Sequence, residues 1–146
     1  MAEVLKIYTD GACSGNPGAG GWAAVLLFGN AKKEISGFVK ETTNNRMELL
    51  AAIEGLKAVK KNCKIELYSD SAYLVNAVKN GWIENWRKSG WRTADKKEVK
   101  NQDLWFQLVA LNEQLSPTYI KVKGHSDNEY NNRADELAVA AIKKHK

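Results

Sequence analysis

Four acidic residues in this sequence have types and positions suited to holding a cation. Asp10 and Asp70 each end a run of mostly apolar residues, while Glu48 and Asp135 lie among apolar residues near the starts of two predicted helices. A carboxylate among residues that favour burial is costly unless something binds it. Hard divalent cations such as Mg²⁺ prefer carboxylate oxygens. The four residues are therefore candidate metal ligands.

Each of these acids also has a purely structural explanation. Asp70 with Ser71 could cap a helix, and an acid in a first helical turn is favoured by the helix dipole. What favours a site is repetition, because two strand-like runs, 5–9 and 65–69, both deliver an aspartate at their carboxyl ends. Open α/β sheets bind ligands outside such ends.

The hydrophobic pattern predicts the elements that must position these residues. Alternating or continuous apolar runs predict strands, and apolar residues three and four positions apart predict helices. The expected strands are 5–9, 21–28, 34–39, 64–69 and 118–122, and the expected helices are 46–60, 72–79, 102–114 and 133–144. The glycine-rich stretch 11–18 leads into a strand rather than a helix, and no Gly-Lys-Ser/Thr follows it. A dinucleotide-binding or P-loop interpretation is therefore rejected.

Composition predicts a single soluble domain over residues 1–146. The chain is 27% charged and 44% hydrophobic, and its longest apolar run, 22–28, is too short to cross a membrane. Two cysteines without metal-site spacing indicate a reducing compartment, so we expect a cytoplasmic protein. The net charge is +5, or 5 + 4 = +9 without the four acids. A basic surface around a small acidic pocket suits a nucleic acid, although mild basicity is also common without such a role.

The segment 79–100 is the compositional outlier of the chain. It holds seven Lys or Arg, three acids and three tryptophans. This mixture fits a nucleic-acid groove, because bases and sugars stack on Trp while phosphates pair with basic side chains. The alternative is that the tryptophans pack onto the body and the lysines are only solvated. We expect Trp86 to pack, and Trp82 and the basic side chains to meet the ligand.

Six ordered motifs resemble those of a known family, type 1 ribonuclease H of the bacterial kind. Each motif alone is weak, but the ordered set is specific, and it spans residues 5 to 143 nearly without gaps. The motifs are YTDGA at 8–12, TNNRME at 43–48, YSDS at 68–71, GWRTA at 90–94, VKGH at 122–125 and NRADELA at 132–138.

The resemblance implies an α/β, ribonuclease H-like fold, with a five-stranded mixed sheet, an antiparallel second strand and helices on both faces. It implies an endonuclease that hydrolyses the RNA strand of RNA–DNA hybrids, largely independently of sequence, leaving 5′-phosphate and 3′-hydroxyl ends. The expected cofactor is Mg²⁺, two ions per site, with Mn²⁺ as a substitute. The expected partner is the hybrid duplex, with no membrane, no obligate protein partner and a monomeric state.

The resemblance also implies roles for particular residues. By similarity, Asp10, Glu48, Asp70 and Asp135 hold the two ions, and His125 transfers a proton. Without the resemblance, His125 would be read as a loop histidine with a local hydrogen bond. The residues expected to contact the hybrid are Asn16, Thr43, Asn44, Asn45 and Asn101, together with Trp82, Lys88, Lys96 and Lys97 of the basic protrusion 82–100.

Three rival interpretations are weighed against this one. An integrase or junction resolvase on the same scaffold is disfavoured by the His125 loop and the Trp-rich protrusion. A hybrid-binding module without catalysis is disfavoured because binding alone has no use for a repulsive acidic cluster. Helix capping explains each acid singly, but not four of them in matching order.

Overall fold

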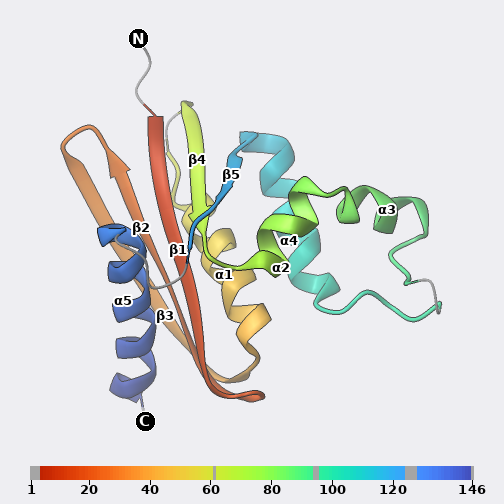
Figure 1. Ribbon diagram of the computed structural model, residues 1–146, viewed down its shortest axis with the longest axis horizontal. Coiled ribbons are helices and arrows are strands. Elements are labelled where there is room, and N and C mark those ends of the chain that lie inside the picture. The colour runs from red at the N-terminus through yellow and green to blue at the C-terminus, as the bar shows by residue number, and fades with distance from the viewer. Residues whose placement is uncertain (1–3, 61, 94–95, 124–127, 146) are drawn as a thin grey trace.

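The computed structural model describes residues 4–60, 62–93, 96–123 and 128–145, which form one sheet with helices around it (Figure 1). The strands are β1 (Val4–Gly15), β2 (Gly18–Phe28), β3 (Ala31–Thr42), β4 (Lys64–Ser69) and β5 (Thr118–Lys121). The helices are α1 (Asn44–Lys57), α2 (Ala72–Lys79), α3 (Trp82–Lys88), α4 (Gln102–Leu115) and α5 (Glu129–His145).

The five strands form a mixed sheet in the order β3-β2-β1-β4-β5. β2 runs antiparallel to β1 and β3, whereas β1, β4 and β5 run parallel to one another. α5 packs on one face of the sheet, α1 and α2 pack on the other, and α4 packs against α1 (Figure 1). The predicted five-stranded mixed sheet with an antiparallel second strand and helices on both faces is confirmed.

Alternation along the central strands divides the core between the two faces. Ile7 belongs to the larger cluster, which α1 and α4 cover, while the neighbouring Tyr8 belongs to a smaller cluster beneath α5. Successive side chains of a strand point to opposite faces, so strands buried on both sides are apolar at nearly every position. This is why the runs that precede Asp10 and Asp70 show little polar alternation.

Several element boundaries differ from the prediction. β1 does not end at residue 9 but continues to Gly15, because the antiparallel partner β2 hydrogen-bonds to it along this whole length. β3 is likewise longer than the predicted 34–39, and α1 begins at Asn44 rather than 46. α3 was not predicted at all, since a seven-residue helix carries too little periodicity to register.

α5 begins at Glu129, four residues before the predicted start at 133. Asn128 supplies the reason, because its Oδ1 accepts hydrogen bonds from the backbone N–H groups of Tyr130 and Asn131, at 3.1 and 3.0 Å. An asparagine in this position satisfies the unpaired N–H groups of a first helical turn. Asn128 is therefore the sequence signal for the start of α5 that the prediction overlooked.

Within the described residues, no helix combines the length and the apolar character that crossing a membrane requires.

Candidate active site

Three of the four predicted carboxylates converge on one point. Asp10, Glu48 and Asp70 each offer an oxygen, and these oxygens all lie within 4.8 Å of one another. Asp10 and Glu48 are each only 5% exposed, whereas Asp70 is half-buried. Residues that are far apart in the chain thus form one acidic cluster, which has an open side at Asp70.

The parallel pairing of β1 with β4 brings the two aspartates together. The last residues paired between these strands are Tyr8 and Tyr68, so Asp10 and Asp70 each lie two residues beyond the same rung. The rings of Tyr8 and Tyr68 stack at 4.5 Å, which reinforces this register. Register in a parallel pair therefore determines that the two carboxylates are neighbours.

Glu48 reaches the cluster because Gly11 has no side chain. A Cβ at Gly11 would lie 2.5 Å from the backbone N of Glu48 and 2.5 Å from the carbonyl carbon of Met47. Real Cβ atoms do not approach backbone this closely, so only glycine allows α1 to start against β1. The Asp-Gly pair at 10–11 is thus one unit: the acid supplies a ligand and the glycine admits the helix that carries another.

Asp135 stands at the edge of the cluster, half-buried on α5 and near enough to the Asp10 carboxyl group to raise its pKa. α5 packs closely because Gly21 of β2 leaves room, since a Cβ there would lie 2.1 Å from the carbonyl oxygen of Ala138. An ion pair between Arg133 Nε and Glu34 Oε2, at 2.8 Å, ties the start of α5 to β3. The structure therefore brings all four predicted carboxylates to one place, with oxygens of three within 4.8 Å of one another and the fourth near Asp10.

Crowding and burial raise the pKa values of the two innermost carboxyl groups. Burial, the charge of Asp70 and the proximity of Asp135 together raise the pKa of Asp10 to about 9. Burial, followed by the charges of Asp10 and Asp70, raises the pKa of Glu48 well above its usual range. Both shifts show that the site disfavours its own negative charge, and a divalent cation is one partner that would relieve this cost.

The carboxylate oxygens of the cluster also suit a hard cation. Oε1 of Glu48 is buried, and no hydrogen-bond donor in the described part of the chain reaches it. Leaving a buried polar oxygen without a partner costs about 1–3 kcal/mol, more for a charged group. Carboxylate oxygens in an open cluster are the donor set that Mg²⁺ or Mn²⁺ takes, whereas no His or Cys joins the group among the described residues. The cluster can hold a divalent metal ion.

The raised pKa of Asp10 predicts how the metal-free protein responds to pH. A carboxyl group with a raised pKa binds its proton more tightly in the folded state, so stability is lost as pH rises from about 4 toward 9. Glu48 shifts in the same direction, whereas the lowered pKa values of Glu34 and Asp103 act only at more acidic pH. In EDTA, we expect the free energy of unfolding to fall by about 2 kcal/mol between pH 5 and pH 9.

Urea unfolding at each pH measures this slope, and Asp10→Asn serves as the control because it removes the titrating group. The Asp10→Asn variant should show a much flatter profile, and Mg²⁺ should restore the stability of the unmodified protein at pH 9. Equal slopes for the two proteins would contradict the assignment of the pH effect to this cluster.

The capping alternative for the acids is wrong. Ser71 is the N-cap of α2, and its Oγ accepts from the backbone N–H of Leu74 at 3.1 Å, so Asp70 is not needed there. Glu48 is the fifth residue of α1 and Asp135 the seventh of α5, so neither lies in the first turn, contrary to the sequence-based prediction. Both helices start earlier than expected, and the helix dipole gives little support to an acid beyond the first turn.

Five of the predicted substrate-contacting residues share a second feature, a polar cavity of about 410 Å³. Its walls come from the β1–β2 turn, the start of α1 and the segment before α4, and they comprise Asn16, Thr43, Asn44, Asn45, Lys100 and Asn101. Thr43 is the N-cap of α1, and Asn16 Oδ1 accepts from the backbone N–H of Asn44 at 3.3 Å. Lys100 was expected to meet the ligand only as one of the basic side chains of 79–100, and was not singled out by number.

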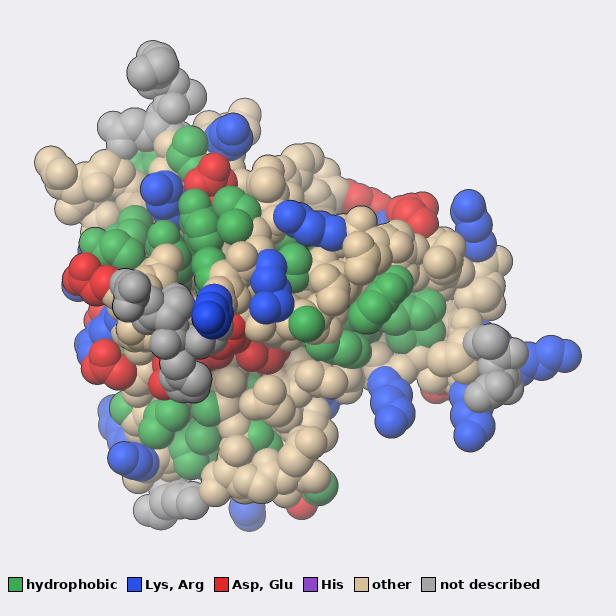
Figure 2. All heavy atoms as spheres, viewed as in Figure 1, with side chains coloured by type: hydrophobic (Ala, Val, Ile, Leu, Met, Phe, Trp, Pro, Cys, Tyr) green, Lys and Arg blue, Asp and Glu red, His purple; other side chains and the backbone are tan. Residues whose placement is uncertain are grey.

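The basic protrusion consists of α3 and the segment that leads to α4, and it projects from the body of the molecule (Figure 1). Lys and Arg side chains are exposed around this projecting end (Figure 2). Trp82 is 36% exposed, and Lys88, Lys96 and Lys97 are exposed as well. These four side chains are therefore accessible to a ligand.

The other tryptophans of this region hold the protrusion to the body. Trp86 contacts Trp105 with ring centroids 5.3 Å apart, and it contacts Trp91 at 5.9 Å. Trp91 in turn meets Phe106 edge-on at 4.8 Å. The prediction that Trp86 packs is confirmed, and Trp91 packs beside it.

A hydrogen-bond network that sequence reasoning missed joins the polar cavity to α1, which carries Glu48, and to α2, which follows Asp70. Arg46 of α1 forms two hydrogen bonds to the Asp103 carboxylate, at 2.9 and 2.7 Å, and a third to Asn101 Oδ1 at 3.3 Å. Asn101 Nδ2 and Trp105 Nε1 both donate to the Tyr73 hydroxyl, at 3.2 and 3.0 Å. Arg46 lay within the motif 43–48, but nothing in the sequence marked Tyr73 or Asp103.

Removing the Tyr73 hydroxyl tests this network. Tyr73→Phe leaves the buried indole N–H of Trp105 and the Asn101 amide without their acceptor, so we expect a loss of about 1–2 kcal/mol in stability. We also expect KM for a nucleic-acid substrate to rise about threefold with kcat nearly unchanged, since Asn101 loses its orientation.

Tyr119→Phe is the matched control, because the Tyr119 hydroxyl donates to Asn112 Oδ1 at 2.6 Å and neither residue lines the polar cavity. It should cost comparable stability and leave KM unchanged. An equal rise of KM in both variants would mean that the Tyr73 effect is only a loss of stability.

His125 lies outside the described residues, so its predicted role has no structural counterpart here.

The fold and the acidic cluster together define a class of protein: a ribonuclease H-like α/β domain with carboxylates gathered beyond the parallel strands. A sequence profile of the RNase H family matches residues 2–143, nearly the whole chain. The chain therefore belongs to the RNase H family, a family of nucleases, and the resemblance inferred from the motifs is confirmed.

Individual relatives agree with this membership. A ribonuclease H of Caldanaerobacter subterraneus subsp. tengcongensis is 64% identical over 143 residues, which are 98% of this chain and 94% of the relative. A ribonuclease H of Chlorobaculum parvum is 62% identical and covers 98% of both chains. Among solved structures, LC9-RNase H1 superposes with a TM-score of 0.87 at 24% identity, over 100% of this chain and 75% of that one. LC11-RNase H1, solved in complex with an RNA/DNA hybrid, gives a TM-score of 0.72 at 25% identity, over 97% and 98%.

Proposed function

We propose that this chain is a metal-dependent endonuclease that hydrolyses the RNA strand of RNA–DNA hybrids, largely independently of sequence. The observation that carries the proposal is the meeting of Asp10, Glu48 and Asp70 within 4.8 Å, with Asp135 against Asp10. Family membership and the hybrid bound to LC11-RNase H1 support the choice of substrate.

The four carboxylates would hold two Mg²⁺ ions, for which Mn²⁺ could substitute. When bound, a pair of such ions lowers the pKa of an attacking water and stabilises the leaving 3′-oxygen, so that the products carry 5′-phosphate and 3′-hydroxyl ends. Glu48 suits an innermost ligand, because its buried Oε1 has no donor among the described residues. Asp70 is half-buried at the open side, where a phosphodiester can approach.

The polar cavity and the protrusion, which adjoin at Lys100, would hold the substrate. Amide and hydroxyl groups of the cavity, such as those of Asn16, Asn44 and Asn45, can donate to and accept from a ribose 2′-hydroxyl, the group that distinguishes RNA from DNA. Trp82 offers a flat apolar face, and Lys88, Lys96 and Lys97 offer positive charge to phosphates of the DNA strand. Few of these groups read base edges, which supports cleavage with little sequence preference.

We assign proton transfer to His125, whose ordinary pKa lies near neutrality. His125→Ala should lower kcat about tenfold and leave KM within twofold, and steady-state kinetics on a hybrid substrate measures both. An unchanged kcat would remove His125 from the mechanism, and the role of a loop histidine with a local hydrogen bond would then stand.

The remaining proposals concern the setting of the reaction. We propose that residues 1–146 act as one catalytic domain, as a monomer without an obligate protein partner, in the cytoplasm. Size-exclusion chromatography with light scattering tests the oligomeric state, and fractionation of the producing cells tests the location. A stable dimer or a membrane-associated pool would contradict these proposals.

A substrate panel separates the proposed activity from its rivals. Labelled RNA–DNA hybrid, duplex RNA, duplex DNA, a four-way DNA junction and single-stranded RNA are each incubated with Mg²⁺ or with EDTA. We expect cleavage of the RNA strand of the hybrid alone, only with metal, and with binding that weakens as salt rises because phosphate contacts are involved. Cleavage of DNA junctions would favour a resolvase, and binding of the hybrid without cleavage would favour a binding module.

A further inference from the structure

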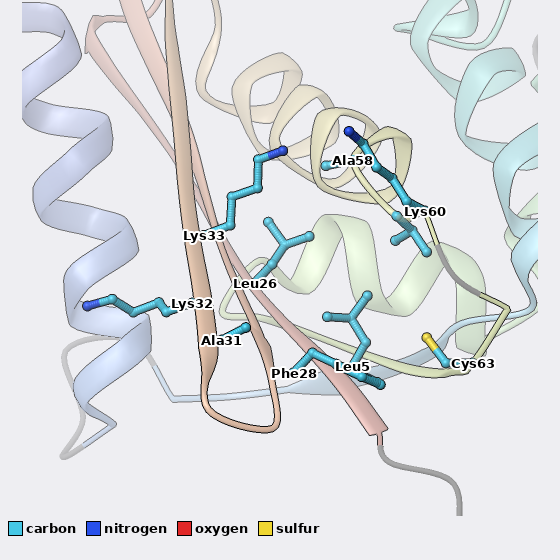
Figure 3. A pocket seen from close by; sticks show the side chains of 10 residues that line it. Leu5, Leu26, Phe28, Ala31, Lys32, Lys33, Ala58, Lys60 and Cys63 are labelled. Carbon is cyan, nitrogen blue, oxygen red and sulfur yellow. The ribbon is translucent and has the colours of Figure 1, made fainter.

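A second cavity, largely apolar and of about 260 Å³, opens at the end of the sheet that the carboxylates do not occupy. It lies between the start of β1, the end of β2 and the end of α1 (Figure 3). Its apolar lining consists of Leu5, Leu26, Phe28, Ala58, Val59 and Cys63. None of these residues belongs to the acidic cluster, the polar cavity or the protrusion.

The cavity exists because the sheet is longer than the helix that covers it. α1 ends at Lys57 and is capped at Ala58, while β1 begins with Val4 and β2 continues to Phe28. Leu5 and Leu26 are buried at this end, whereas Phe28, Ala58 and Val59 are only partly buried. The sheet surface beyond the last helical turn is thus an apolar floor with only partial cover.

Lys33 and Lys60 lie above this floor. The strand register explains the direction of the Lys33 side chain. Lys33 of β3 pairs with Leu26 of β2, and paired residues share a face of the sheet, so Lys33 projects to the side of α1. Lys32 pairs with Leu27 and projects to the opposite side, where it forms an ion pair with Glu34 at 3.9 Å. Figure 3 shows this difference: the Lys33 amine reaches toward Ala58, as does that of Lys60, whereas Lys32 turns away.

The charges at the mouth of the cavity are uncompensated. Within the described residues, no carboxylate lies within 4.0 Å of the ammonium group of Lys33 or of Lys60. The last turn of α1 contributes a partial negative charge of about half an elementary charge, which two full positive charges outweigh. An anionic group would therefore complement the charges at this rim. An apolar group would complement the floor of the cavity.

The volume limits the size of the ligand. An apolar cavity of about 150 Å³ is enough to bind benzene, and pockets for drug-sized molecules span about 300–1,000 Å³. A cavity of about 260 Å³ lies between these limits. It fits one ring or a short branched chain, with the charged group left at the rim.

We propose that this cavity binds a small monocarboxylate with a compact apolar body, its carboxylate held between Lys33 and Lys60. The inference does not depend on the nuclease activity, because it uses none of the residues assigned to that activity. The affinity is modest, with a dissociation constant on the order of 1 mM for a ligand of about a dozen heavy atoms.

The test is a titration of the full chain with 4-phenylbutyrate, followed by the backbone amide signals in ¹H–¹⁵N NMR spectra. We expect saturable shifts confined to the amides around Leu5, Leu26 and Val59. The neutral analogue 4-phenylbutyramide should bind at least about tenfold more weakly, because it lacks the charge. Inorganic phosphate, which has the charge without the apolar body, should also bind at least about tenfold more weakly.

Charge-removing variants locate the anion. Lys33→Gln and Lys60→Gln should each weaken 4-phenylbutyrate binding about twofold to fivefold, because each keeps most of the length of the side chain and loses one ammonium group. Lys32→Gln is the matched control: Lys32 borders the cavity, but its side chain turns away from it (Figure 3), to the other side of the sheet. It should leave the affinity unchanged.

Several results would overturn the proposal. They are the absence of saturable shifts up to about 20 mM, equal binding of the amide, equal binding of phosphate, or equal losses in the Lys32→Gln and Lys33→Gln variants. The comparison of the acid with its amide uses the unmodified protein, so the proposal stays testable even if a variant folds poorly.

Discussion

Asp10→Asn is expected to lower the rate of RNA cleavage at least about 1,000-fold while leaving hybrid binding within a few-fold of the original. The reason is that Asp10 lies at the centre of the acidic cluster, with Glu48 and Asp70 oxygens within 4.8 Å and Asp135 nearby. Asparagine keeps the shape of the side chain but offers a weaker, neutral ligand to a divalent cation. Single-turnover cleavage and equilibrium binding of the same labelled hybrid measure the two quantities separately.

Glu66→Gln is the matched control for this variant. Glu66 is a carboxylate on β4, four residues before Asp70, but it accepts a hydrogen bond from the Tyr68 hydroxyl at 2.7 Å and lies outside the cluster. We expect its cleavage rate to stay within threefold. A fall in hybrid binding that matches the fall in cleavage for Asp10→Asn would mean that Asp10 acts by holding the substrate.

Gly11→Ala is expected to disturb both the stability and the acidic cluster, because the added methyl group would lie against the start of α1. The new Cβ would lie 2.5 Å from backbone atoms of both Met47 and Glu48, and backbone cannot swing aside as the end of a flexible side chain can. We expect the start of α1 to shift, with a loss of about 3 kcal/mol in stability from overpacking. Cleavage should fall at least about 100-fold, since a displacement near 1 Å at a catalytic group can cost that much.

Thermal unfolding and cleavage assays at a temperature where the variant is folded measure both effects. Gly90→Ala is the control, because Gly90 has a positive φ of 68° but no atom within 4 Å of its would-be Cβ. It should lose only about 1 kcal/mol, from backbone strain alone, and keep its activity. If Gly11→Ala behaves like Gly90→Ala, the close approach of α1 to β1 does not position Glu48.

The sequence predicted the aspartates well because their positions follow from chain-local patterns. Each lies at a fixed distance beyond an apolar strand, and the parallel register then makes them neighbours. Local patterns also predicted that the loop 11–18 leads from one strand into the next. The antiparallel direction of the second strand was implied by the resemblance to type 1 ribonuclease H.

Other features could not be predicted, because they depend on contacts between distant parts of the chain. Gly11 matters because the backbone of residues 47 and 48 approaches it closely. Tyr73 matters because its hydroxyl accepts hydrogen bonds from Asn101 and Trp105. The length of β1 depends on how far β2 remains paired with it. The apolar cavity depends on α1 ending before the strands do, a mismatch between elements that neither run of residues reveals alone.

The most direct test of the central claim is crystallographic. Crystals of the protein soaked in Mn²⁺ would be measured at a wavelength where manganese scatters anomalously, so that metal positions appear independently of the protein atoms. We predict anomalous peaks between the carboxylates of Asp10, Glu48 and Asp70, with Asp135 at the second of two positions. Peaks found only elsewhere, or none at Mn²⁺ concentrations that support cleavage, would contradict the assignment of this cluster as the metal site.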